Sequence, residues 1–161
     1  MCPQEANRSD SSRAATGRLY YLRSDKDTHF TGAVANGNTE NETITGLESD
    51  KIMIRRVIVE AIENRALTIA FFAASTFQTV DLDSDAYLGE VQFVAADGVR
   101  MNAAGFPQYV YDSGALELPY IDAEARGQLN VAYVCRDAAG KAAGAAGNVV
   151  VTIGYEPVRE D

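Results

Sequence analysis

The acidic segment "DLDSDAYLGE" is the first place where this sequence could do chemistry. Asp81, Asp83 and Asp85 stand at alternate positions, and Glu90 follows them. Carboxylate oxygens are the ligands that Ca²⁺ prefers in proteins, so the three aspartates are candidate calcium ligands. The segment departs from the EF-hand pattern, which has a glycine at its sixth position where this chain has Ala86. The alternative is a solvated acidic turn that precedes a strand.

The segment "AAGKAAGAAG", residues 138–147, is built almost entirely of alanine and glycine around Lys141. A phosphate-binding loop ends in Gly-Lys-Ser/Thr and opens a helix, whereas here alanines follow the lysine and a strand pattern comes next. We therefore exclude a nucleotide site. Small side chains let another backbone come close, so we expect a subunit contact here. The expected interface residues are Gly140, Ala143, Gly144, Ala146 and Gly147.

Nucleophilic and acid–base chemistry has few candidate residues in this chain. His29 is the single histidine, and it lies in a polar segment where a surface role is the ordinary one. Cys2 and Cys135 are far apart, so they give neither a disulfide framework nor the spacing of a metal site. Cys135 ends an alternating apolar run, which predicts a buried, unreactive thiol. We expect no catalytic residue, no metal and no cofactor.

The aromatic segment "FPQYVYDSG" offers one further kind of site. Tyr109 and Tyr111 would share one face of a strand and could form the floor of a carbohydrate site. The chain has no tryptophan, however, and tyrosines of a core or an interface are the other explanation. We favour this second interpretation.

Short segments of alternating or continuous apolar character must position all these residues. Isoleucine and valine dominate residues 51–62, and their branched side chains favour a strand over a helix there. In residues 86–95 we expect Tyr87, Val91 and Phe93 to point inward. Residues 25–50 read as a long loop holding at most a short strand near 43–47. The other expected strands are residues 17–25, 66–75, 106–111, 115–121, 128–136 and 148–158.

This regular succession of short strands, without a convincing long helix, predicts an all-β fold: an antiparallel β-sandwich or jelly roll. The chain has 161 residues, which suits one domain. We expect that domain at residues 17–161, preceded by an extended N-terminal arm at residues 1–16. The leader is polar and serine-rich, a composition typical of disorder, and it has no apolar face of its own. We expect it to be ordered as an arm that lies on a neighbouring subunit.

The net charge of the chain limits the classes of partner that it is expected to bind. The formal net charge is −9, from 23 acidic and 14 basic residues, so the long-range field repels nucleic acid and anionic membranes. No run of about 18 apolar residues is present, and the N-terminus lacks the apolar core of a signal peptide. We expect no nucleic-acid and no membrane partner, and synthesis in a reducing cytoplasm.

The C-terminal half reads "LELPYIDAEARGQLNVAYVCRDAAGKAAGAAGNVVVTIGYEPV". An apolar pair before "PY", an Asp-containing turn, a strand, a small-residue loop and a terminal valine-rich strand follow one another. This order resembles that of small structural proteins of tailed bacteriophages, and the resemblance covers residues 55–158. It looks like a capsid decoration protein or another accessory virion protein of β-sandwich type.

The resemblance implies a non-enzymatic virion protein that is made in the cytoplasm of a bacterial host and lies on the capsid exterior. Its partners would be the major capsid protein and further copies of itself, as a trimer or dimer. The alternative is a β-sandwich module that binds a carbohydrate or a receptor in a phage tail or adhesion apparatus.

Overall fold

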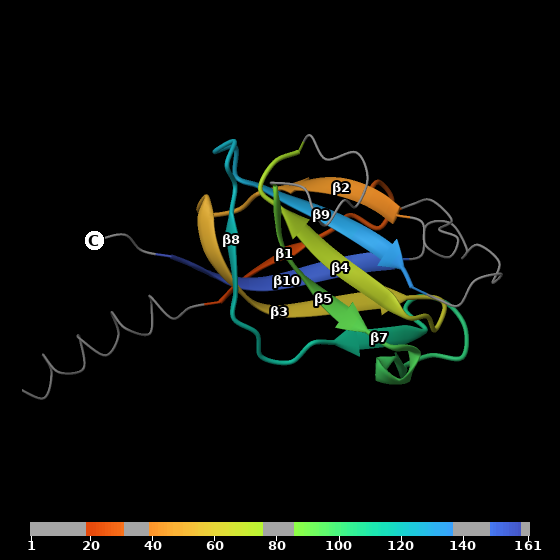
Figure 1. The fold of residues 1–161 in the computed structure, drawn as a ribbon. Coiled ribbons are helices and arrows are strands. Elements are labelled where there is room, and N and C mark those ends of the chain that lie inside the picture. Colours follow the sequence, from red (N-terminus) through yellow and green to blue (C-terminus); the bar gives the residue numbers. More distant parts are fainter. Residues whose placement is uncertain (1–18, 31–38, 76–85, 137–148, 159–161) are drawn as a thin grey trace, which may run out of the picture.

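Two antiparallel β-sheets face each other in the computed structural model, which describes residues 19–30, 39–75, 86–136 and 149–158. The two sheets cross in Figure 1 with the core between them. The expected all-β antiparallel sandwich is therefore confirmed. In chain order the elements are β1 (Tyr20–Arg23), β2 (Thr39–Thr45), β3 (Lys51–Ala61), β4 (Leu67–Phe72), β5 (Tyr87–Phe93), the 3₁₀ turn η1 (Ala95–Asp97), β6 (Val99–Arg100), β7 (Tyr109–Asp112), β8 (Leu118–Ile121), β9 (Gln128–Cys135) and β10 (Val149–Pro157).

The first sheet is organised around β3, its longest strand. The strand order is β1-β10-β3-β7-β6, and β8 also pairs with β3. One edge of β3 pairs with β10 over nearly its whole length, while the other edge pairs first with β8 and then with β7. The register with β10 shifts between Gly154 and Tyr155. Gly154 lies opposite Arg56 and Tyr155 lies opposite Ile54, so Arg55 is an extra residue of β3 at this point. This is a β-bulge, which bends the strand and re-aims its side chains.

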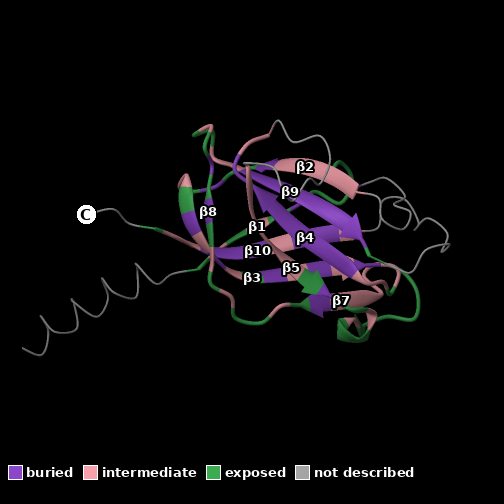
Figure 2. Cartoon of the chain, viewed as in Figure 1, coloured by how far each residue is buried: buried purple, intermediate pink, exposed green. Residues whose placement is uncertain are grey.

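The second sheet has the order β2-β9-β4-β5. All six residues of β4 are buried, and so is nearly all of β9, which Figure 2 shows as two purple strands. Such strands read as continuous apolar runs rather than alternating ones. On the inner face β4 supplies Leu67, Ile69 and Phe71, which pack into the main core.

The orientation of one residue of β5 differs from the expectation. Tyr87 does not point into the main core; it packs against Phe72 on the opposite face of the sheet. The register between β4 and β5 is irregular at this place, and Gly89 has a positive φ of 152°, which reverses the alternation. The positive φ disfavours any side chain at this position, and a Cβ there would also displace the end of the Leu118 side chain of the other sheet, so glycine fits best. The expected inward positions of Val91 and Phe93 agree with the structure.

Strand β2 is longer and begins earlier than the expected short strand near 43–47. It spans Thr39–Thr45 and pairs with β9 along all seven residues. Its sequence "TENETIT" is polar at most positions, so it gives no apolar alternation from which a strand could be read. Pairing with a strongly apolar neighbour holds this segment extended.

Three tyrosines join the core to the loops around it. Tyr111, Tyr120 and Tyr155 are each at most 2% exposed, and each hydroxyl reaches a backbone group outside its own strand. The Tyr155 hydroxyl accepts the N–H of Glu48, and the Tyr111 hydroxyl accepts the N–H of Arg65. A buried phenol oxygen must find such a partner, because leaving it without one in an apolar core is costly.

Candidate functional site

His29, the single histidine of the chain, is used within its own turn. Its Nδ1 accepts the N–H of Asp25 at 2.9 Å, and Asp25 Oδ1 accepts the N–H of Asp27 at 2.7 Å. The imidazole therefore closes a local turn after β1. Among the described residues, no three or more His, Cys, Asp or Glu side chains are grouped so that they could hold a metal ion.

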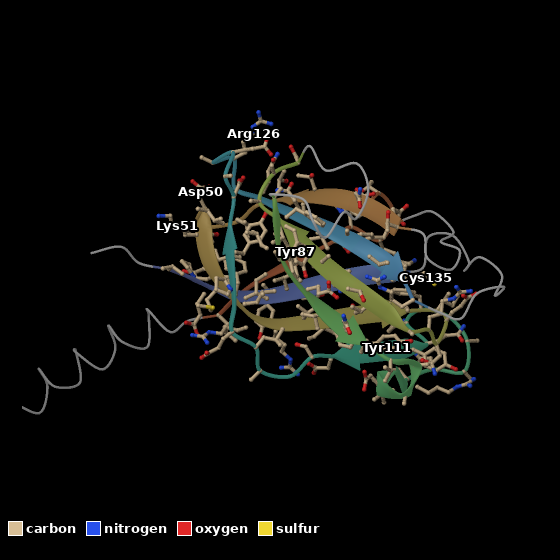
Figure 3. All side chains as sticks on the ribbon, viewed as in Figure 1. Asp50, Lys51, Tyr87, Tyr111, Arg126 and Cys135 are labelled. Atoms are coloured by element: carbon tan, nitrogen blue, oxygen red, sulfur yellow. The ribbon has the colours of Figure 1, made fainter. Side chains whose placement is uncertain are left out.

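Cys135 is a buried thiol at the end of β9, as the apolar run predicted. Figure 3 shows it at one end of the sandwich. The guanidinium of Arg65 donates to its sulfur at 3.2 Å and also donates to Glu63 at 2.8 Å. The thiol is fully covered, so this contact orders the turn before β4 and offers no nucleophile to solvent.

Both segments singled out by composition fall outside the described residues. Asp81, Asp83 and Asp85 lie in residues 76–85, and Gly140, Ala143, Gly144, Ala146 and Gly147 lie in residues 137–148. Residues 1–16, the expected arm, are likewise outside. These three remain predictions from the sequence.

Glu90, the carboxylate that follows the acidic segment, has partners of its own. It accepts the Tyr87 hydroxyl at 2.9 Å and the Gln92 amide at 2.6 Å. Burial, followed by the hydrogen bond to Glu90, raises the pKa of Tyr87 to about 12. The carboxylate thus anchors the side chains of β5.

The tyrosine pair of β7 does not form an exposed floor. Tyr111 is fully buried and packs against Phe93 of the opposite sheet. Tyr109 is partly buried, and the guanidinium of Arg100 lies 5.9 Å from the centre of its ring. Tyr111 is therefore a core residue, as the favoured interpretation had it, and a carbohydrate site on this pair is not supported.

The structure instead opens a groove on the outer face of the first sheet, where the sequence had indicated no site. It has a volume of about 840 Å³ and lies around the β3 bulge. Four separate parts of the chain meet there: the start of β1, the bulge, the link between β7 and β8, and the end of β10. The lining residues are Leu19, Arg55, Arg56, Gly114, Ala115, Leu116, Glu117 and Glu156.

Ion pairs fix the polar side chains of this groove. Arg55 lies between two carboxylates, 3.1 Å from Glu117 and 3.4 Å from Glu156. Arg56, the next residue of β3, pairs with Asp112 of β7 through two guanidinium nitrogens. A guanidinium that binds both carboxylate oxygens is held in one plane, so these groups present their remaining donors and acceptors in fixed directions.

The aromatic wall beside the groove comes from Tyr21. Its strand pairs with β10 so that Tyr21 lies opposite Gly154, and Gly154 in turn lies opposite Arg56. A Cβ added to Gly154 would be 3.0 Å from the Tyr21 ring, so the ring rests on the bare backbone of the strand. Tyr21 nevertheless stays 56% exposed. The result is an accessible ring next to the Arg56–Asp112 pair.

We predict an acid-side titration for this pair. The hydrogen bond from Arg56, followed by the N–H of Gly114, holds the pKa of Asp112 below its ordinary value. A depressed carboxyl pKa contributes stability that is present above the unfolded-state pKa of about 3.9 and is lost as the pH falls through the folded-state value. Carboxyl NMR should show Asp112 titrating below the ordinary value, and Arg56→Gln should move the midpoint upward. An unchanged midpoint in Arg56→Gln would contradict this assignment.

One signal in the sequence could have indicated the groove. Two consecutive arginines interrupt the alternation of "KIMIRRVIVEA", and a doubled polar position within a strand is typical of a bulge. The convergence of Leu19, residues 114–117 and Glu156 on that bulge depends on the strand order, which the pattern does not give.

Comparison with known proteins adds no relative. In the described part of the chain, no helix has the length and apolar character needed to cross a membrane. A scan against protein-family models finds none that matches the chain, and a search of curated proteins finds no match either.

Proposed function

We propose that this protein is a non-enzymatic structural component of a virion, a capsid decoration protein that binds the major capsid protein lattice. The resemblance of residues 55–158 to small phage structural proteins is the starting point. The described residues support an assembly role through one surface feature, which lies at the edge of the first sheet.

That feature is the β6 edge, formed by Val94, Val99 and Met101. These residues are 58%, 61% and 58% exposed and lie on one short connection through η1 and β6. Strand β6 ends the order of the first sheet. Val99 lies in β6 itself, while Val94 precedes η1 and Met101 directly follows β6. Exposed apolar side chains beside the outer strand of a sheet offer contact area to another chain. The β6 edge is the observation that carries the proposal.

The virion proposal is tested by attachment to shells. Purified protein is mixed with shells of the major capsid protein from the same phage and sedimented. We expect saturable binding at a fixed ratio to the lattice, and a lower melting temperature for particles that lack this chain. Shells that sediment without it, and particles that keep their full thermal stability in its absence, would refute the decoration role.

The β6 edge gives a sharper prediction. The double change Val99→Lys and Met101→Lys is expected to weaken shell binding or self-association by about tenfold or more, because two exposed apolar contacts become charged. The far-ultraviolet circular dichroism should not change, since both side chains are exposed. The double change Ile121→Lys and Val158→Lys adds the same two charges and is the matched control, because both residues are exposed but line a different hollow. Equal loss in the control would point to net charge rather than to this edge.

A second candidate function, a carbohydrate- or receptor-binding module of a phage tail or adhesion apparatus, is favoured by the groove beside Tyr21. This groove and the β6 edge involve different residues. Ligand binding and attachment to a shell can therefore be tested independently of each other.

A further inference from the structure

The groove on the outer face of the first sheet has the chemistry of a site for a neutral sugar. The first component of such a site, the Tyr21 ring, lies beside the lining residues rather than among them: it rests on Gly154, next to Arg56, and remains 56% exposed. An aromatic ring that is both supported and open provides an apolar surface against which the C–H face of a pyranose can stack. Leu19 and Leu116 add apolar surface along the groove.

The second component is the set of polar groups along the groove. Arg55 and Arg56 offer guanidinium donors, while Glu117 and Glu156 offer carboxylate acceptors. A sugar carries neighbouring hydroxyls that each donate and accept a hydrogen bond, so it matches alternating donors and acceptors. The pairs of Arg55 with Glu156 and of Arg56 with Asp112 orient the two guanidinium groups before a ligand arrives, which lowers the entropic cost of binding, whereas Glu117 is mostly exposed and less restrained.

The charge balance selects a neutral ligand. Two arginines and two glutamates line the groove, and Asp112 at its edge neutralises Arg56. No excess positive charge is left to attract a phosphate, sulfate or sialic acid, and the chain as a whole carries −9. A cationic ligand would have to displace an arginine from a carboxylate that is already paired. The polar groups thus suit hydroxyls better than ions.

The size of the groove is also appropriate. About 840 Å³ lies within the range of roughly 300–1,000 Å³ that small-molecule sites occupy. We propose that the groove formed by the β3 bulge and the 114–117 link binds a neutral oligosaccharide, with Arg55, Arg56, Glu117 and Glu156 as hydroxyl ligands and the adjacent Tyr21 as the stacking surface. This assignment rests on the groove and is independent of the virion role.

The test uses the full chain on an array of neutral, sialylated and sulfated glycans, followed by calorimetry with the best neutral oligosaccharide. We expect binding to neutral glycans. Tyr21→Ala and Glu117→Ala should each weaken it by about tenfold or more, because one removes the stacking surface and the other an acceptor. Tyr21→Phe should stay within about threefold, since the ring is kept. Arg100→Ala, at β6, is the control that should have no effect.

Several outcomes would overturn the assignment. One is the absence of neutral glycan binding at millimolar concentration, and another is preference for the sialylated or sulfated glycans. Binding that survives both Tyr21→Ala and Glu117→Ala would place the site elsewhere; Glu117 is 81% exposed, so its variant tests the idea even if Tyr21→Ala disturbs β1. Self-association lost in the same two variants would make a second copy the occupant. Shell binding that is unchanged in these variants separates this proposal from the virion role.

Discussion

Replacing Asp122 with alanine is expected to lower the free energy of unfolding by about 3 kcal/mol. The carboxylate is buried and closes the turn between β8 and β9 from inside. Its Oδ1 accepts the N–H of Glu124 at 3.0 Å, and its Oδ2 accepts those of Arg126 at 2.8 Å and Gln128 at 2.9 Å. Alanine leaves three backbone donors without this acceptor. Urea unfolding followed by circular dichroism measures the difference.

The backbone conformation of this turn explains why water cannot easily replace Asp122 as the acceptor for these N–H groups. Ala125 and Gly127 both have positive φ angles, of 53° and 65°, and the Gly127 carbonyl accepts the N–H groups of Gly46 and Leu47. Relaxing the turn to hydrate its donors would break these bonds as well.

A matched control for Asp122 comes from the turn that follows β1. Asp25→Ala removes an exposed carboxylate that accepts the N–H of Asp27, so its cost should be within about 0.5 kcal/mol. Asp122→Asn keeps one acceptor oxygen and should lie between the two alanine variants. If Asp122→Ala costs no more than Asp25→Ala, the buried carboxylate does not stabilise the fold in the way proposed.

The parts of the fold that could be predicted are those in which local pattern and tertiary environment agree. Strands β3, β4, β9 and β10 are rich in Ile, Val, Leu and Phe, and each is recognisable before any pairing is known. The two-sheet architecture follows, because several such strands without helices must cover each other's apolar faces. Cys135 could also be placed correctly, since it continues the run of β9.

Features set by a neighbouring strand could not be read in the same way. Strand β2 is polar in sequence and is extended because β9 pairs with it. The orientation of Tyr87 depends on the irregular register next to Gly89, which reverses a simple alternation. In both places the partner strand determines the conformation, and a one-residue change of register moves every following side chain to the other face.

The groove was even less predictable from the sequence than these two features. Arg55 and Arg56 are visible as a polar interruption of a strand, but their partners Asp112, Glu117 and Glu156 come from two other strands and a loop. The stacking surface is likewise a cross-strand pair, Tyr21 on Gly154, and not the tyrosines of β7. The segments of unusual composition lie elsewhere in the chain. The groove is formed by residues of ordinary composition that come together only in the folded structure.

Replacing Tyr120 with phenylalanine is the second large effect that we expect, with a loss of about 2 kcal/mol in the free energy of unfolding. Tyr120 belongs to β8 of the first sheet, and its hydroxyl reaches across the core to the second. It donates to the carbonyl of Gln128 at 2.8 Å and accepts the N–H of Asn130 at 2.9 Å. Phenylalanine keeps the ring packed against Phe71 but leaves both backbone groups of β9 without this partner.

The comparison with Tyr21→Phe separates the hydroxyl from the ring. Tyr21 is exposed, so losing its hydroxyl should change the unfolding free energy by less than about 0.5 kcal/mol. Amide hydrogen exchange gives a second readout, because the Asn130 N–H should lose protection in Tyr120→Phe. Burial raises the pKa of Tyr120, so the hydroxyl stays protonated and able to donate. Tyr120→Phe with wild-type stability and a protected Asn130 amide would mean that packing alone holds the two sheets together at this end.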